Sequence, residues 1–188
     1  LWAASVQAEN EWAYCAPSPA AKAAVEVRDD AAMTFTADTV SKEGAEYHLQ
    51  GNVVGHRGEQ QLEAQRLFYN EETSQAKADG EVRYRLGDRL LSSDSAVLNL
   101  TDDRGQFSPA RFWLADKHIR GKANTVDLQG KSVTELNDAE FTTCDEGDNA
   151  WLLRASSLRL DTAANEGIAR HARVSFMHVP IFYFPYLS

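Results

Sequence analysis

The side chains that most often perform catalysis or bind metals are scattered through this sequence. Its five histidines stand apart, at spacings that match no zinc or metalloprotease motif: His48, His56, His118, His171 and His178. Neither a G-x-S-x-G nucleophile turn nor a phosphate-binding glycine loop is present. The acidic run Asp145-Glu146-Gly147-Asp148 lacks the spacing of a calcium-binding EF-hand loop, which favours a solvated turn. We therefore predict that the chain is not an enzyme and binds no metal or cofactor.

The two cysteines, Cys15 and Cys144, are too few for a disulfide scaffold and form no CxxC pattern. Three interpretations of them stay open on spacing alone. They are free thiols in a core, a disulfide with each other, or two half-bridges to cysteines that lie outside this sequence.

Charge and hydropathy limit the possible partners. The formal net charge of -9 disfavours nucleic-acid binding and gives no attraction to an anionic membrane surface. Apolar residues make up 43% of the chain, enough for a sizeable core. No run approaches the ~20 apolar residues of a membrane-spanning helix. Any lipid ligand would therefore be held mainly through its apolar part.

From residue 33 onward, short runs alternate between apolar and polar residues and are separated by turn residues. Examples are Val82-Arg83-Tyr84, Val126-Asp127-Leu128 and Leu158-Arg159-Leu160. A period of two predicts β-strands with one buried face. No segment has a convincing helical pattern, so we predict an all-β fold.

The runs also repeat along the chain. A small residue followed by two polar residues recurs about every 30 residues, at Ala37, Ala64, Ser93, Ala123 and Ala155. A second element follows each of these by 14 to 17 residues, at Gly51, Gly80, Ala110, Ala139 and Ala172. A repeat of this length predicts strand–turn–strand units that bury a continuous apolar face only when they stack.

Stacked units of this kind predict two antiparallel sheets whose inward-facing side chains form the interior. The candidate groove residues are Val53, Leu67, Tyr69, Val82, Tyr84, Leu98, Phe112, Leu114, Val126, Leu128, Phe141, Leu158, Leu160, Val174 and Phe176. Their outward neighbours, such as Glu81, Arg111 and Arg159, are polar, as in a sandwich or jellyroll. Two interpretations stay open: the side chains fill the interior as a closed core, or the sheets splay and leave room for a lipid tail.

Two segments near the end of the chain are distinctive. One is Phe141-Thr142-Thr143-Cys144, followed by an acidic, glycine-bearing loop and Trp151. The other is the proline- and aromatic-rich run at 179–188. Both resemble the end of the N-terminal periplasmic domain in the family of lipopolysaccharide-assembly proteins LptD, just before the outer-membrane barrel. The repeats resemble the OstA-like fold that this family shares with the bridge protein LptA.

The resemblance implies an OstA-like twisted β-jellyroll, open-ended and with an apolar interior groove. Residues 1–31 would be a loosely ordered N-terminal leader, residues 32–178 the jellyroll domain, and residues 179–188 a connector into a barrel absent from this sequence. The implied function is to bind the acyl chains of lipopolysaccharide and pass it from the periplasmic bridge to the outer-membrane barrel for surface assembly. The alternative is a structural or partner-docking β-domain with a closed core and no lipid path.

The resemblance also implies a location and partners. The domain would lie at the periplasmic face of the outer membrane and contact lipopolysaccharide, LptA, and its own C-terminal barrel with a plug lipoprotein. LptA would pair with an exposed edge strand formed by Met33, Thr34, Phe35, Thr36, Ala37 and Asp38. In this family, cysteines matching Cys15 and Cys144 form disulfides with cysteines near the end of the barrel.

Overall fold

The regular elements of the computed structural model, which describes residues 34–115 and 118–188, are all β-strands. The predicted leader, Cys15 and Met33 lie outside the described residues. The strands are β1 (Thr34–Thr36), β2 (Thr39–Glu43), β3 (Glu46–Arg57), β4 (Gln60–Asn70), β5 (Gln75–Leu86), β6 (Arg89–Asn99), β7 (Arg104–Leu114), β8 (Ile119–Ala123), β9 (Thr125–Gln129), β10 (Val133–Thr142), β11 (Trp151–Asp161), β12 (Glu166–Phe176) and β13 (Val179–Leu187). The prediction of an all-β fold is confirmed.

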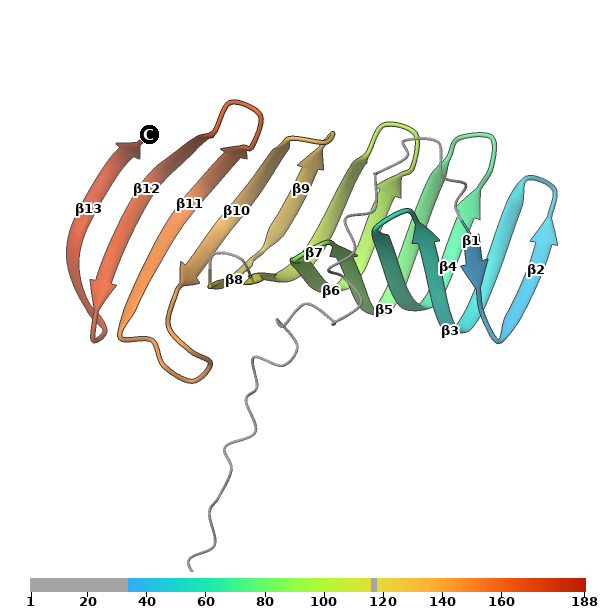
Figure 1. Cartoon of the computed structure of the whole chain (residues 1–188), viewed down its shortest axis with the longest axis horizontal. Helices are drawn as coiled ribbons and strands as arrows, with labels where there is room; N and C mark the ends of the chain where they lie inside the picture. The colour runs from blue at the N-terminus through green and yellow to red at the C-terminus, as the bar shows by residue number, and fades with distance from the viewer. Residues whose placement is uncertain (1–33, 116–117) are drawn as a thin grey trace, which may run out of the picture.

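One continuous antiparallel ladder connects these strands. Its order is β1-β3-β4-β5-β6-β7-β8-β10-β11-β12-β13, with β2 beside β3 and β9 between β7 and β10. Figure 1 shows the strands following one another along the long axis of the molecule, from β2 at one end to β13 at the other. Short turns between neighbouring strands account for this order, because antiparallel partners need only a tight connection.

The long strands are bent near their midpoints, and the repeats found in the sequence mark the bends. Ladder pairing is interrupted at Gln50/Val53, Glu63/Arg66 and Asp79/Val82. Residues at the bends have positive φ, at Asn52, Glu81, Asp138 and His171. Such local twists turn a flat ladder into a sheet that folds over on itself, which produces the two layers of a jellyroll.

Small buried residues lie next to the bends of the strands. Alanines lie within two residues of a bend and are 0–2% exposed, at Ala78, Ala96, Ala110, Ala139 and Ala172. The two halves of the folded sheet meet closely there, so larger side chains would force them apart. Of the recurring small residues of the sequence, Ala110, Ala139 and Ala172 are therefore explained by close packing at the bends.

The folded sheet has two rims, each made of turns. We call the turns β3–β4, β5–β6 and β7–β8 the first rim, and the turns β4–β5, β6–β7, β9–β10 and β11–β12 the second rim. Backbone hydrogen bonds join neighbouring turns along each rim. In the first rim, the N–H of Ala115 donates to Asp88 O (3.2 Å). In the second, Leu100 donates to Ser74 O (2.9 Å) and Thr162 to Ser132 O (2.9 Å).

The interior is packed in its N-terminal part. Phe107 and Leu67 are 0% exposed, Val53 1% and Leu62 2%. The Phe107 ring lies 5.6 Å from the Tyr84 ring, and both belong to the same core cluster. The main cluster continues to Leu136 and Ala139 in β10, and a separate, smaller cluster near the C-terminal end consists of Ala155, Ala169 and Ala172. The hydrophobic core is therefore concentrated in β3 to β7.

Residues 179–188, assigned from the sequence to a connector, contain the edge strand β13, which pairs with β12. A proline cannot donate a ladder hydrogen bond, but an edge strand tolerates it. Pro180 lies opposite Ser175, where the register shifts. The sheet therefore runs through this segment.

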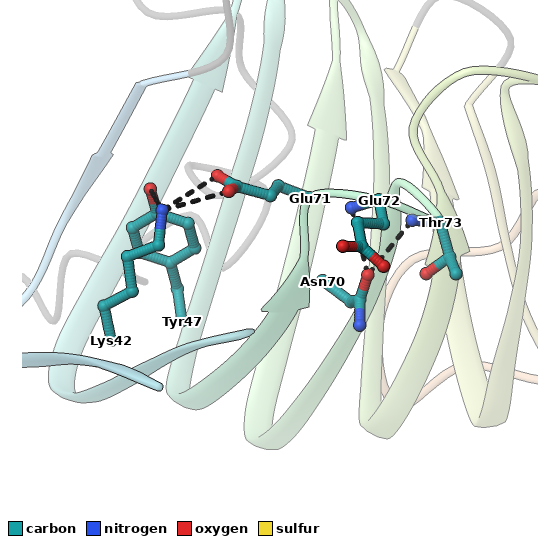
Figure 2. A network of polar contacts seen from close by, with 6 residues as sticks. All are labelled: Lys42, Tyr47, Asn70, Glu71, Glu72 and Thr73. Carbon is teal, nitrogen blue, oxygen red and sulfur yellow. Dashed lines mark hydrogen bonds and ion pairs between the residues drawn. The ribbon is translucent and has the colours of Figure 1, made fainter. Parts of the chain in front are cut away.

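At the opposite end, β1 and β2 form one bent strand along β3. The N–H of Asp38 donates to Gly51 O (2.9 Å), and the Asn52 amide donates to the Asp38 carboxylate (2.9 Å). Figure 2 shows how β2 is attached: the Lys42 ammonium donates to the Tyr47 hydroxyl (2.7 Å) and to the Glu71 carboxylate (3.0 Å). These contacts hold β2 to β3 and to the turn after β4.

Replacing Lys42 by Met is expected to raise the pKa of the Glu71 carboxyl toward 4.5, its ordinary value. The hydrogen bond from Lys42 lowers this pKa, so any stability that the contact contributes is present above pH 4.5 and is lost as the pH falls through the lowered value. Carbon-13 NMR titration of the carboxyl measures the shift. Lys122→Met, which removes a lysine paired with Glu140 instead, serves as the control. An unchanged Glu71 titration in Lys42→Met would contradict this account.

Candidate functional site

A cavity of about 780 Å³ lies between the two rims. Its mouth is formed by first-rim residues, including Arg57, Gly58 and Arg89, and by second-rim residues, including Thr101 and Lys131. Its walls come from the inner faces of β5 to β11 and are largely leucine and aromatic side chains. This volume lies in the range of sites that bind small organic ligands.

Eight of the predicted groove residues line this cavity. They are Tyr84, Phe112, Leu114, Val126, Leu128, Phe141, Leu158 and Leu160. They come from five strands far apart in sequence, and the fold of the sheet brings them together. Phe112 is 7% exposed and Val126 1%, whereas Leu128, Leu158 and Leu160 are half-buried and face the open space.

The other predicted groove residues lie elsewhere. Val53, Leu67 and Val82 are buried in the packed N-terminal core, and Tyr69 packs beside that core against Tyr47 and Phe35. Leu98 borders a separate small cavity of about 30 Å³. Val174 is half-buried on β12, and Phe176 is 49% exposed at the end of that strand.

Several cavity residues were not predicted. The apolar ones are Leu86, Leu90, Leu91, Trp113, Ile119 and Leu136. Leu90 and Leu91 are consecutive, as are Phe112, Trp113 and Leu114, although alternation assigns neighbouring residues to opposite faces. These residues lie at strand ends, where the sheet twists into the rims. Leu136 is 4% exposed in mid-strand, and alternation around it could have identified it.

Polar residues concentrate at the N-terminal end of the cavity. Arg57 contacts Gln60, the Leu100 carbonyl and Asp103. Tyr84 lies beside this group, and withdrawal of its hydroxyl from water raises its pKa to about 12. Tyr84 therefore stays neutral at physiological pH and contributes a ring and an uncharged hydroxyl to the cavity wall.

The family of this chain follows from its similarity to known proteins. Residues 31–166 match the family described as "LptA/(LptD N-terminal domain) LPS transport protein". The chain belongs to this LptA/LptD N-terminal domain family. Because the family consists of transport proteins, the prediction that the chain is not an enzyme is confirmed.

Several LptD proteins are similar to this chain. The LPS-assembly protein LptD of Nitrosococcus oceani is 37% identical over 180 residues, which is 94% of this chain and 24% of that protein. The LptD of Alkalilimnicola ehrlichii is 30% identical over 208 residues, covering 100% of this chain and 28% of that protein. The chain thus spans about a quarter of the length of these relatives.

A solved structure is also similar. It is LptH of Pseudomonas aeruginosa, described as the LptA-homologous periplasmic component of the lipopolysaccharide transport device. The match has 12% identity and a TM-score of 0.34, and it covers 77% of this chain and 86% of LptH.

The Cys144 loop of this LptD-like chain, between β10 and β11, is fixed by Arg120. The guanidinium donates to the carbonyls of Cys144 (2.9 Å), Asp145 (2.9 Å) and Asp148 (2.6 Å). The buried Thr142 hydroxyl donates to Trp151 O (2.7 Å) at the other end of the loop. Within the described residues, Cys144 is a half-buried free thiol.

The acidic residues of this loop form no metal site. Among residues 34–115 and 118–188, no three His, Cys, Asp or Glu side chains are grouped so that they could hold a metal ion. The same residues contain no helix long and apolar enough to cross a membrane. The main feature of the described residues is therefore the apolar cavity between the two rims.

Proposed function

We propose that the central cavity binds the acyl chains of lipopolysaccharide and conducts them toward the outer-membrane barrel. The observation that supports this most strongly is the cavity of about 780 Å³, lined by apolar side chains and bordered by both rims. A closed core would leave no such space, because protein interiors normally pack without large voids. Membership in a family of lipopolysaccharide transport proteins supports the choice of ligand.

Burial of the acyl chains accounts for affinity without charge attraction. Each methylene withdrawn from water contributes roughly 0.8 kcal/mol. The chain carries a formal net charge of -9, so its overall field does not attract an anionic lipid. The polar head of the lipid would stay in water at the mouth, between the two rims.

A docking function is the second candidate, and the packed N-terminal core is the observation that favours it. In the N-terminal core, Val53, Leu67 and Phe107 are 0–1% exposed, and the cavity beside Leu62 has a volume of only about 30 Å³. A purely structural domain would be packed in this way throughout. The two functions are compatible if the N-terminal part docks a partner and the central part holds lipid.

The partner at that end would be LptA, paired with the edge strand. β1 has a ladder partner on one side, β3, and the five residues of β2 are all exposed. Unpaired strand edges bind other strands readily through backbone hydrogen bonds. At the other end we propose contact with the protein's own barrel and its plug lipoprotein, disulfides from Cys15 and Cys144 to that barrel, and a location at the periplasmic face of the outer membrane.

A photo-crosslinking amino acid at position 160 is expected to form adducts with lipopolysaccharide. The same residue at position 159 should form few or none, because Arg159 is exposed on the opposite face of β11. Gel mobility and mass spectrometry of the adducts measure the difference. Equal adduct yields at the two neighbouring positions, or no adduct at 160, would contradict the proposed function.

A further inference from the structure

An ion pair between Arg57 and Asp103 joins the two rims of the folded sheet. Arg57 ends β3 in the first rim, and Asp103 lies in the second rim, directly before β7. In the ladder, Arg57 pairs with Gln60, whereas Arg104 pairs with Asn99 at the opposite end of the strands. In a flat sheet, Arg57 and Asp103 would therefore be separated by a full strand length. They meet because the strands fold over.

The Arg57 guanidinium uses its separate N–H groups on different acceptors. Nε donates to Gln60 Oε1 within its own rim (3.0 Å). Nη1 donates to the Leu100 carbonyl and Nη2 to the Asp103 carboxylate, both across the mouth. A planar fork of this kind holds two groups in a fixed relation, which a lysine ammonium does not do.

This contact lies at a boundary inside the molecule. Six residues border both the central cavity and the small cavity of about 30 Å³: Arg57, Gln60, Tyr84, Leu100, Asp103 and Leu128. Beyond them the interior is packed, with Leu62 2% and Leu98 6% exposed. The ion pair therefore lies between the open part of the groove and its closed N-terminal part.

We propose that Arg57 and Asp103 form a clasp that keeps the N-terminal part of the groove closed and parts when a lipid enters it. This inference rests on the proposed function, because it concerns the path of the same acyl chains. A lipid that arrives from the β1–β2 end must pass the boundary to reach the central cavity. The packed side chains there can separate only if the two rims separate.

The chemistry of the clasp suits a contact that opens. Its side chains are 22% and 21% exposed, so both charges reach water at the mouth. When the rims part, water replaces each partner, and neither charge is left buried and unpaired. Apolar side chains at the same place would gain no hydrogen bonds from water when they separate. The ion pair is thus stable when the groove is empty, and water replaces it when lipid enters the groove.

The distance between the rims tests the clasp directly. Spin labels are placed at Glu59→Cys and Thr101→Cys, two exposed residues on opposite rims, with Cys15 and Cys144 replaced by Ser. Electron–electron double resonance then measures the distance, with and without lipopolysaccharide. We expect lipopolysaccharide to lengthen the distance in the otherwise unmodified chain. Arg57→Ala should raise the population of the longer distance about tenfold without lipid.

Three further variants make the result specific. Asp103→Asn keeps the side-chain shape and should show the same change to a smaller degree. The charge exchange Arg57→Asp with Asp103→Arg should restore the shorter distance. Arg154→Ala removes an ion pair of the outer face, with Glu140 at 2.9 Å, and should change nothing.

The outcomes separate the clasp from the proposed function. Suppose that adducts form at position 160 but that neither lipid nor Arg57→Ala changes the distance between the rims. This result would overturn the clasp and leave the proposed function intact. An equal change in Arg154→Ala would overturn the clasp as well. Absence of adducts at position 160 would overturn the proposed function, and the clasp with it.

Discussion

Replacing Leu128 by Asp is expected to abolish binding of lipopolysaccharide while the chain stays folded. Leu128 borders both cavities and is half-buried, so a carboxylate there reaches the water of an empty groove. An acyl chain that enters must remove that water, and an unpaired buried charge costs several kcal/mol. We expect the affinity to fall by about a hundredfold or more, which corresponds to about 3 kcal/mol.

The matched control for this change is Val97→Asp. Val97 is 48% exposed on β6, so its replacement adds the same charge outside the groove. Binding of a fluorescent lipopolysaccharide, measured together with circular dichroism, reports affinity and folding for both variants. Unchanged affinity in a folded Leu128→Asp variant would contradict a lipid path past this residue.

Phe107→Ala is expected to lower the free energy of unfolding by about 3–5 kcal/mol. Phe107 is 0% exposed and packs against Tyr84 in the N-terminal core, so truncation leaves a cavity in a packed interior. Phe68→Ala is the control, because Phe68 is 37% exposed and packs edge-on against His48 at the surface. It should cost about 1 kcal/mol.

Urea unfolding followed by tryptophan fluorescence measures both changes. A large loss for Phe107 and a small one for Phe68 would show that stability comes from the packed part of the groove. Comparable losses for the two phenylalanines would contradict the assignment of β3 to β7 as the main core.

Much of the fold could be predicted from the sequence because the signals are local. Alternation in Val126-Asp127-Leu128 determines which side chain points inward, and this holds wherever a strand is regular. The repeated small residues are also local, and at Gly51, Gly80 and Ala139 they mark bends of the folded sheet. Only the pairing of the strands shows that each of these positions is a bend within one strand.

The site was predicted best where apolar and polar residues alternate. Leu128 and Leu160 line the cavity as alternation requires, whereas Leu90 and Trp113 line it beside apolar neighbours that line it too. Leu67 and Leu158 occupy the same position of the repeat, three residues after Ala64 and Ala155, yet Leu67 is packed and Leu158 faces open space. That difference depends on the distance between the two halves of the sheet, which no local pattern encodes.

The rim contact of Arg57 could not be predicted at all. Its partner Asp103 is 46 residues away and belongs to a turn that the ladder places at the other end of the strands. The contact follows from how far the sheet twists and folds between β3 and β7. Such long-range geometry is a property of the assembled fold.

A crystal structure of the chain with bound lipopolysaccharide would show where the acyl chains lie. The rival site is β13, where Val179, Ile181 and Phe182 are at least half exposed. We expect electron density for acyl chains between Leu128, Leu136 and Leu160, with the polar head at the mouth between the rims. Acyl density only along β13, with the cavity filled by water or by closed side chains, would contradict it.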